Sequence, residues 1–406
     1  MLYLRWLETS KRFADRPAVF DGGNEVSFGQ LAALAEAAPP ATGPVIARTG
    51  GIGFFIEILR AWRDGQAVVP VEKDSPEPSL AQEPGPEVRL VKHTPGASGI
   101  PRGIFFSAPQ ILADADRLIH AMRLTPEQPN LAVLSLSHSY GFSNIALPML
   151  LGGVPLRLVA YPFPRVIEEA LSHHESMTVA AVPSMWRAWH RSGILKNAPI
   201  RLAVSAGAPL ALSLEHEVFE QAGLKIHNFY GASECGGIAW DDSETPRTSA
   251  DILGRALPGV DVRLENDGRF LVSSDAVALG YDAPRPDDVL GNGVYQTRDR
   301  GFISANGELH LTGTTGSAIN ASGRKISPAK VEAALLSTGL VRSVKVFGIP
   351  SKDPERFEEI AAKVELNEGS TLETLKSAAM DKLQPWEMPR HWREGGGGTE
   401  TTTFHD

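Results

Sequence analysis

The stretch HNFYGASECGG, residues 227–237, has the pattern of a β-strand that runs into a turn. The strand would end at Tyr230, and Gly231 would permit a tight backbone just after it. Ser233 and Glu234 would then project beyond the carboxyl end of the strand, where ligands bind in open α/β sheets. An aromatic ring there can stack on a base, and a carboxylate can hold Mg²⁺ beside phosphates. The alternative is an ordinary corner with a solvated glutamate.

Short apolar runs alternate with helical patterns around this stretch. Strands are predicted at 44–47, 67–71, 131–136, 177–182, 200–206 and 225–230, and helices at 52–63, 108–122, 183–192 and 210–222. Such alternation is typical of α/β architecture with largely parallel sheets. From about Gly254 the pattern changes to short strands, with hairpin signals at Asp267-Gly268 and Asn306-Gly307.

The predicted organisation is a large domain, a small domain and a tail. Residues 1–315 would form a large α/β domain of mostly parallel sheets with packed helices and a small β-barrel-like part. Residues 316–394 would form a small α+β unit, with a helix that begins after Ser327-Pro328 because proline suits a first helical turn. Residues 395–406, GGGGTETTTFHD, lack apolar periodicity and are expected to be a disordered tail.

Composition excludes several classes of protein. The 406 residues are 42% hydrophobic and 21% charged, which excludes wholesale disorder. The net charge of −9 argues against nonspecific binding to nucleic acid or anionic membranes, although a local basic pocket could hold a phosphate. Cys235 is the single cysteine, so neither an intramolecular disulfide nor a thiolate-rich metal site can form. We expect a cytoplasmic protein.

No targeting or membrane segment is expected. The N-terminal stretch carries Arg5 and Glu8 among its apolar positions and has no signal-peptide core. The most apolar long stretch, residues 144–163, is interrupted by prolines and glycines. It is therefore expected to form a buried helix followed by a strand rather than a membrane span.

Two further segments carry candidate chemistry. In HTPGASGIPRG, residues 93–103, three glycines let backbone N–H groups approach an anion, while hydroxyls and Arg102 add donors and charge. This is not the Walker pattern, and a solvated loop is an equal alternative. In YQTRDRG, residues 295–301, Asp299 could accept hydrogen bonds from ribose hydroxyls, or simply pair with a neighbouring arginine. Neither GASEC nor the 93–103 loop fits the G-x-S-x-G pattern of hydrolases.

In their order along the chain these segments resemble the adenylate-forming superfamily, which includes acyl- and aryl-CoA synthetases, adenylation domains of peptide synthetases, and luciferases. HTPGASGIPRG is similar to the phosphate loop of that superfamily, and NFYGASE to its Tyr-Gly-x-Ser/Thr-Glu core. YQTRDRG is similar to the ribose-binding segment. LSLSHSYGF at 134–142 resembles the acyl-pocket segment, VSAGAPL at 204–210 the adenine-side turn, and GRKISPAKVEAAL at 323–335 the opening of a mobile C-terminal lid.

The resemblance implies a role for each matching residue. The phosphates of ATP would be held by Thr94, Gly96, Ser98, Gly99 and Arg102. The nucleoside would be bound by Ala206, Gly207, Ala208 and Pro209 beside the adenine, by Tyr230 and Gly231 of the core motif, and by Asp299 at the ribose. Ser233 would approach the α-phosphate and Glu234 would bind Mg²⁺. His138 would lie near the carboxylate of the substrate, unless it merely caps a helix. Gly207, Ala232 and Gly236 would line an acyl pocket, with Ala232 also in the nucleotide-binding motif.

The implied reaction is ATP-dependent activation of an aryl or acyl carboxylic acid to an acyl-adenylate, with release of pyrophosphate. Mg²⁺ and the phosphate-binding donors would stabilise the charge that develops during the transfer. Rotation of the lid would then present a thiol, usually that of coenzyme A. Two alternatives stay open, a nucleotide- or acyl-binding pseudoenzyme and a module that loads a carrier protein. An oligomer is possible.

Two departures from the superfamily pattern concern the C-terminal part. Thr314 stands where an arginine is usual, and Gly316 occupies the hinge, where glycine keeps rotation plausible. No lysine follows Lys382, although the superfamily supplies one shortly after a segment like MPRHW. We therefore expect adenylation slowed by about 10²–10³-fold, by analogy with loss of one oxyanion donor, and hypothesise that the native end is missing or altered.

Overall fold

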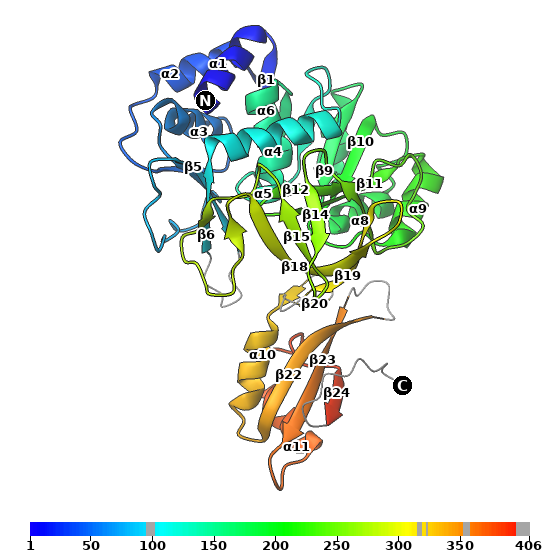
Figure 1. Ribbon diagram of the computed structural model, residues 1–406. Helices are drawn as coiled ribbons and strands as arrows, with labels where there is room; N and C mark the ends of the chain where they lie inside the picture. The colour runs from blue at the N-terminus through cyan, green and yellow to red at the C-terminus, as the bar shows by residue number, and fades with distance from the viewer. Residues whose placement is uncertain (95–101, 315–318, 322–323, 352–357, 395–406) are drawn as a thin grey trace. The chain divides into compact units, whose positions relative to one another are not determined.

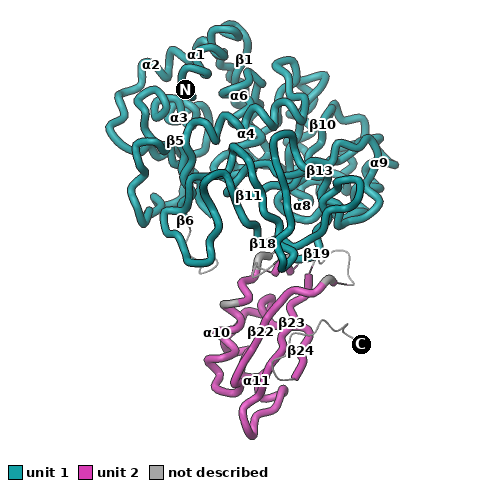
Figure 2. Tube along the Cα trace, in the orientation of Figure 1, with its two compact units in different colours: residues 1–95, 101–313 teal, residues 96–100, 314–406 magenta. Residues whose placement is uncertain are grey.

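The computed structural model describes residues 1–94, 102–314, 319–321, 324–351 and 358–394. The chain divides into two compact units, which are described separately (Figure 2). The described part of unit 1 comprises residues 1–94 and 102–313, and that of unit 2 begins at residue 314. Gly96, Ser98, Gly99, Gly316 and the 395–406 tail lie outside the described residues.

A large mixed sheet runs through unit 1, in the strand order β14-β15-β18-β19-β13-β12-β11-β10-β9-β7-β8-β1-β2, with β17 paired to β18. Its strands are β1 (Pro17–Asp21), β2 (Asn24–Ser27), β7 (Asn130–Ala132), β8 (Leu156–Leu158), β9 (Met177–Ala181), β10 (Ile200–Ser205), β11 (Ile226–Ala232), β12 (Gly236–Trp240), β13 (Ile252–Ala256), β14 (Asp261–Leu264), β15 (Arg269–Ser273), β17 (Leu290–Gly291), β18 (Val294–Ile303) and β19 (Glu308–Thr314).

The pairing in this sheet changes from parallel to antiparallel at β11. Strands β1, β8, β7, β9, β10 and β11 pair in parallel, as the alternating pattern predicts. Antiparallel pairing begins with β12 at Gly236, earlier than the change of pattern near Gly254 suggests. The two predicted hairpin turns are present, because Asp267-Gly268 joins β14 to β15 and Asn306-Gly307 joins β18 to β19.

A second sheet of unit 1 has the order β16-β6-β5-β4-β3. It consists of β3 (Val45–Arg48), β4 (Val68–Val71), β5 (Val88–Thr94), β6 (Arg102–Ser107) and β16 (Gly280–Tyr281). Strands β3, β4 and β5 are parallel, whereas β6 is antiparallel to both of its neighbours. Thr94 pairs with Arg102, so the two ends of the predicted phosphate loop are held side by side.

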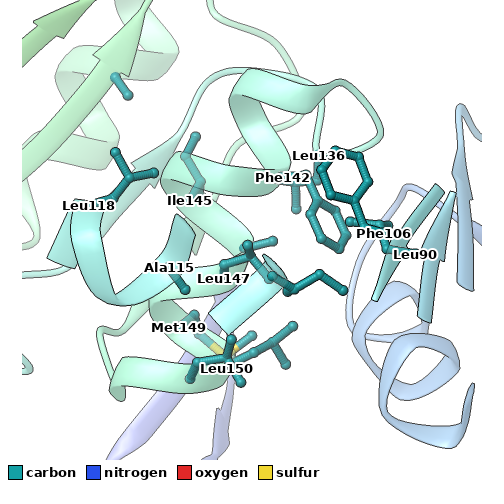
Figure 3. Packing of buried hydrophobic residues seen from close by; sticks show 14 of the residues in the cluster. Leu90, Phe106, Ala115, Leu118, Leu136, Phe142, Ile145, Leu147, Met149 and Leu150 are labelled. Atoms are coloured by element: carbon teal, nitrogen blue, oxygen red, sulfur yellow. The ribbon is translucent and has the colours of Figure 1, made fainter. Parts of the chain in front are cut away.

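Helices of unit 1 cover and separate these sheets (Figure 1). They are α1 (Leu2–Arg12), α2 (Phe28–Ala37), α3 (Gly53–Arg63), α4 (Ala108–Ala121), α5 (Ser139–Gly141), the π-helix η1 (Phe142–Ala146), α6 (Leu147–Gly152), α7 (Pro164–Ser172), α8 (Pro183–Ser192) and α9 (Leu212–Ala222). Phe106 of β6 lies beside Phe142 of η1 in one buried apolar cluster (Figure 3). Burial of such side chains stabilises the fold by about 1.5–3 kcal/mol each.

The apolar stretch at 144–163 forms a buried helix and then a strand, as predicted, namely α6 and β8. Within the described ranges no helix is long and apolar enough to cross a membrane. The strand predicted at 131–136 is shorter than expected, because β7 ends at Ala132 and the following residues leave the sheet.

Unit 2 is a small α+β fold. Its elements are β20 (Ile319–Ala321), β21 (Arg324–Ile326), α10 (Pro328–Leu336), β22 (Val341–Pro350), β23 (Glu358–Leu366), α11 (Leu372–Met380) and β24 (His391–Glu394), with the sheet order β22-β23-β24. Ser327 caps α10 by accepting a hydrogen bond from the backbone N–H of Lys330. Val331 and Leu335 of α10 pack on Val346 and Ile360 in its core.

Candidate active site

Tyr230 and Asp299 are joined across two strands of the large sheet. The Tyr230 hydroxyl, near the end of β11, donates a hydrogen bond of 2.6 Å to Oδ2 of Asp299 on β18. Burial raises the pKa of Tyr230 well above its usual value, and the Asp299 carboxylate raises it further. The phenol therefore stays protonated and donates. This pairing places an aromatic ring and a carboxylate acceptor together, which are the groups predicted to bind the base and the ribose.

Gly231 is required by the way β11 pairs with β12. The register shifts between Tyr230 and Gly231, so that Gly231 faces Gly237 and Ala232 faces Gly236. A Cβ at Gly231 would lie 2.7 Å from the carbonyl oxygen of Gly236, which a side chain could not tolerate. The glycine thus lets the strand turn sharply before Ser233 and Glu234.

Glu234 is held by a neighbour from the second sheet. The Tyr281 hydroxyl of β16 donates a hydrogen bond of 2.8 Å to Oε1 of Glu234, and the backbone N–H of Ala278 donates to the Glu234 carbonyl at 2.9 Å. Burial raises the pKa of Tyr281, and the Glu234 carboxylate adds to this effect. The Glu234 side chain is half-buried.

Glu234 alone is not a complete Mg²⁺ site, so Mg²⁺ would bind there only together with the phosphates of a nucleotide. Within the described part of the chain, no group of three or more His, Cys, Asp or Glu side chains could hold a metal ion. Mg²⁺ bound beside nucleotides commonly uses one or two carboxylates together with phosphate oxygens and water. Glu234 could supply such a carboxylate.

Arg102 is engaged by Asp288. Its guanidinium nitrogens lie 2.6 and 3.3 Å from the two carboxylate oxygens of Asp288, and both side chains are largely buried, at 10% and 12% exposure. The guanidinium also stacks 3.7 Å from the ring centroid of Tyr281. Burial acts to lower the pKa of Arg102, but the bond to Asp288 outweighs it and the pKa is raised. Arg102, Tyr281 and Glu234 therefore form one connected cluster.

His138 lies apart from that cluster. It precedes α5, where its carbonyl accepts from the Phe142 N–H at 2.8 Å, while its side chain makes no capping bond and is 75% exposed. Its Nε2 lies 3.6 Å from Oε1 of Glu72, which follows β4. Glu72 was not anticipated from the sequence, because nothing local distinguishes it from an ordinary surface glutamate.

The remaining predicted residues occupy the ends of neighbouring strands. Thr94 ends β5, and the turn from Ala206 to Pro209 follows β10. Gly207 has a positive φ of 81°, and the nearest described side chain to the position of a Cβ there is Val182, at 3.5 Å. Ser233 is half-buried, and its side chain makes no hydrogen bond with a residue that the structure describes.

Asp114 occupies the position that a side chain at residue 236 would take. Gly236 has a φ of +70°, and a Cβ there would lie 2.1 Å from Oδ1 of Asp114. Asp114, on α4, is buried and accepts from the N–H of Gly237 at 3.2 Å. Lys92 on β5 is also buried, with its Nζ 3.1 Å from the Ser143 hydroxyl. The sequence signal for this lysine is a charged residue inside an apolar strand.

Comparisons with known proteins agree with this arrangement. The model of a family described as AMP-binding enzyme matches residues 57–281. The chain is 25% identical over 328 residues to the mitochondrial medium-chain acyl-CoA ligase of Bos taurus, covering 74% of this chain and 53% of the relative. It is 26% identical over 331 residues to a 4-hydroxybenzoate–CoA/benzoate–CoA ligase of Rhodopseudomonas palustris, covering 75% and 60%. The matches therefore span about half to three-fifths of the length of these relatives.

Solved structures share the fold at low sequence identity. The o-succinylbenzoate CoA synthetase of Bacillus subtilis matches with a TM-score of 0.73 and 18% identity, covering 96% of this chain and 94% of the other. The amide bond synthetase of Marinactinospora thermotolerans matches with a TM-score of 0.72 and 21% identity, covering 97% and 95%.

Proposed function

The chain belongs to the AMP-binding enzyme family, and we propose that it uses ATP to activate a carboxylic acid as an acyl-adenylate and then forms a thioester with coenzyme A. One observation carries the proposal most directly. At the carboxyl end of β11 the hydroxyl of Tyr230 is hydrogen-bonded to the carboxylate of Asp299. Glu234, four residues after Tyr230 in the chain, adds a second carboxylate. This set of groups suits a base, a ribose and a metal-bound phosphate.

Each group would act at a defined point. Asp299 would exchange the Tyr230 hydroxyl for ribose hydroxyls, and the Tyr230 ring would cover the base. Ser233 would donate to the α-phosphate, while Thr94, Gly96, Ser98, Gly99 and Arg102 would hold the departing phosphates. Mg²⁺, when bound by Glu234 and phosphate, supplies positive charge that offsets the charge on the leaving pyrophosphate.

The bonds exchanged are few. A carboxylate oxygen of the acid forms a bond to the α-phosphorus, and the bond from that phosphorus to pyrophosphate breaks. The thiolate sulfur of coenzyme A then attacks the acyl carbon, and AMP leaves with the electron pair of the carbon–oxygen bond. Positioning of the reactants contributes much of the acceleration in such transfers.

The acid is proposed to be an acyl or aryl acid. The names of two relatives, a medium-chain acyl-CoA ligase and a benzoate–CoA ligase, support this range. His138 would approach the acid carboxylate, and Gly207, Ala232 and Gly236 would contact its carbon skeleton. Coenzyme A is the proposed thiol, with a carrier protein as the alternative acceptor. The buried free thiol of Cys235 is compatible with a reducing, cytoplasmic setting.

A second candidate function is nucleotide or acyl binding with weak chemistry. The observation that favours it is the ion pair between Arg102 and Asp288, because an arginine already neutralised at 2.6 Å is less available to phosphate. Arg102 would have to exchange a carboxylate for a phosphate before it could stabilise the triphosphate.

Exchange of labelled pyrophosphate into ATP tests the two candidates. Aryl, short-chain and long-chain acids would be screened with Mg²⁺, followed by chromatography for acyl-CoA and by a parallel assay with a carrier protein. Acid-dependent exchange supports activation. Binding of AMP by calorimetry without exchange for any acid would replace the proposed ligase with the binding function.

A further inference from the structure

A cavity of about 580 Å³ opens at the carboxyl ends of strands from both sheets of unit 1. Its lining residues follow β1 and β8 of the large sheet and β3 and β4 of the second sheet, and they include the segment 132–136 after β7. Ligands of α/β proteins commonly bind at this edge, and the volume lies in the range of small-molecule sites. Among the residues that the structure describes, none of those proposed above to bind nucleotide lines it.

One wall of the cavity is acidic and rich in hydroxyl groups. Oε1 of Glu72 accepts hydrogen bonds from the hydroxyls of Ser135 and Ser137, the latter at 2.8 Å, and Oε2 accepts from Thr49 at 3.1 Å. Burial acts to raise the pKa of Glu72, but these three hydrogen bonds outweigh it and the pKa is lowered. Glu72 is therefore ionised at neutral pH, and its side chain remains 42% exposed.

Asp21 adds a second carboxylate to the lining. It lies beside Gly51, where a Cβ would come within 2.9 Å of Oδ2. Neither Asp21 nor Lys73, the lysine in the lining, forms a side-chain ion pair with any residue in the described ranges. Glu72 has the imidazole of His138 at 3.6 Å, so Asp21 is the lining carboxylate without an ionic partner among the described residues.

The lining also has an apolar wall. Val133, Leu158 and Met185 contribute to it together with Pro162. Tyr161 and Phe163, on either side of Pro162 in the sequence, are both 64% exposed, and their ring centroids lie 5.8 Å apart. Exposed aromatic side chains next to a cavity offer apolar area and favourable contact with a cation.

We propose that this cavity binds a primary amine, with its ammonium group on Glu72 and Asp21 and its carbon skeleton against the apolar wall. A carboxylate has about four acceptor positions, and three on Glu72 are used by hydroxyls, which leaves a place for an N–H donor. The lining carries two carboxylates against the one ammonium of Lys73, so an anionic ligand would meet a net negative charge. A neutral ligand without O–H or N–H donors would displace water from those charges without replacing its hydrogen bonds, which is costly.

The bound amine has two possible origins, a substrate that accepts the acyl group or an effector that does not react. The first rests on the proposed adenylation, and His138, 3.6 Å from Glu72, would link the two sites. In that reaction the ammonium first loses a proton to the imidazole of His138. The amine nitrogen then bonds to the carbonyl carbon of the acyl-adenylate, the bond from that carbon to AMP breaks, and AMP leaves with the electron pair. The nitrogen loses its second proton to water, which leaves an amide.

Calorimetry with benzylamine and no nucleotide tests the site independently of adenylation. We expect the full chain to bind benzylamine at least tenfold more tightly than benzyl alcohol, and Glu72→Gln to weaken benzylamine by at least tenfold. Glu83→Gln, an exposed glutamate outside the lining, is the matched control and should bind as the parent chain does. Equal affinities for the amine and the alcohol, or benzylamine binding unaffected by Glu72→Gln, would overturn the proposal. The proposal would also be overturned if the chain bound pantetheine instead of benzylamine and if that binding depended on Glu72.

Two additions make the test decisive. Asp21→Asn should also weaken benzylamine and carries the test if Glu72→Gln fails to fold, as judged by thermal melting. Mass spectrometry of a mixture with ATP, benzoate and benzylamine then separates the two origins, because N-benzylbenzamide identifies an acceptor and binding without amide identifies an effector. Failure of ATP–pyrophosphate exchange alone would remove the proposed ligase but leave the calorimetric result intact.

Discussion

The Tyr230 hydroxyl and the Asp299 carboxylate share a hydrogen bond of 2.6 Å, although 69 residues separate them in the chain. The bond fixes the aromatic ring at the end of β11 relative to the carboxylate on β18. A ribose that binds Asp299 must compete with this hydroxyl, so the ring and the carboxylate are expected to respond to nucleotide together.

Asp299→Ala should weaken AMP binding by about 10-fold or more, because each hydrogen bond to a charged group contributes about 1.5–3 kcal/mol. Tyr230→Phe keeps the ring and should change the affinity less. Calorimetry measures both, with Asp242→Ala, an exposed aspartate, as the control. An Asp299→Ala variant that binds AMP as tightly as the parent chain would remove the ribose assignment.

Glu234→Gln should keep the fold, because the amide oxygen of glutamine can still accept from Tyr281, but it should weaken the proposed metal site. We expect the Mg²⁺ concentration for half-maximal pyrophosphate exchange to rise by about 10-fold, since neutral amides bind Mg²⁺ less well than carboxylates. Thermal melting checks the fold. Unchanged activation by Mg²⁺ in the variant would show that Glu234 is not a ligand.

Asp288→Asn should release Arg102, which should lower the stability of the fold but raise the affinity for ATP. The free energy of unfolding should fall by about 3 kcal/mol, because the variant leaves a largely buried guanidinium without its charged partner. The affinity for ATP should rise, because Arg102 becomes available to phosphate. Urea unfolding and calorimetry measure the two effects, and Asp287→Asn on the neighbouring exposed residue is the control. If ATP binds the variant no more tightly, Arg102 does not contact the triphosphate.

Asp64→Asn should flatten the acid dependence of stability. Two hydrogen bonds of 2.8 Å from Arg63 hold the pKa of Asp64 at about 2, below the value of about 3.9 expected in the unfolded chain. A lowered pKa in the folded state contributes stability that is present above about pH 4 and is lost as the pH falls towards 2. Urea unfolding at pH 5 and pH 3 should therefore show a larger loss for the parent chain than for Asp64→Asn. Equal losses would contradict the assignment.

Local signals in the sequence were sufficient for much of the fold. The helix predicted at 183–192 matches α8, because proline begins it and Gly193 ends it with a φ of 79°. The family resemblance is confirmed, and it depends on short motifs that follow individual strands. The strand at 131–136 was predicted too long, because Ser135 and Ser137 bond to Glu72, more than 60 residues earlier in the chain. Pairing of β24 with β23 is equally non-local and was not foreseen.

The partners of the site residues could not be read from the sequence. Tyr281 lies 47 residues after Glu234, and Asp288 lies 186 residues after Arg102. Neither partner belongs to a recognisable motif. Tyr281 reaches the site through the pairing of β16 with β6, and Asp288 lies in the loop between β16 and β17. The sequence therefore indicates candidate site residues, and the tertiary structure determines which groups hold them.

The burial of Cys235 gives the chain an intrinsic reporter. It is the single cysteine of the sequence, it has no exposed surface, and it follows Glu234 directly. Burial raises the pKa of its thiol, and thiol reagents attack the thiolate, so labelling requires the turn after β11 to open. The rate at which a thiol reagent labels Cys235 under native conditions therefore measures how often this turn opens. No engineered cysteine is needed. A nucleotide that closes the site should slow that rate.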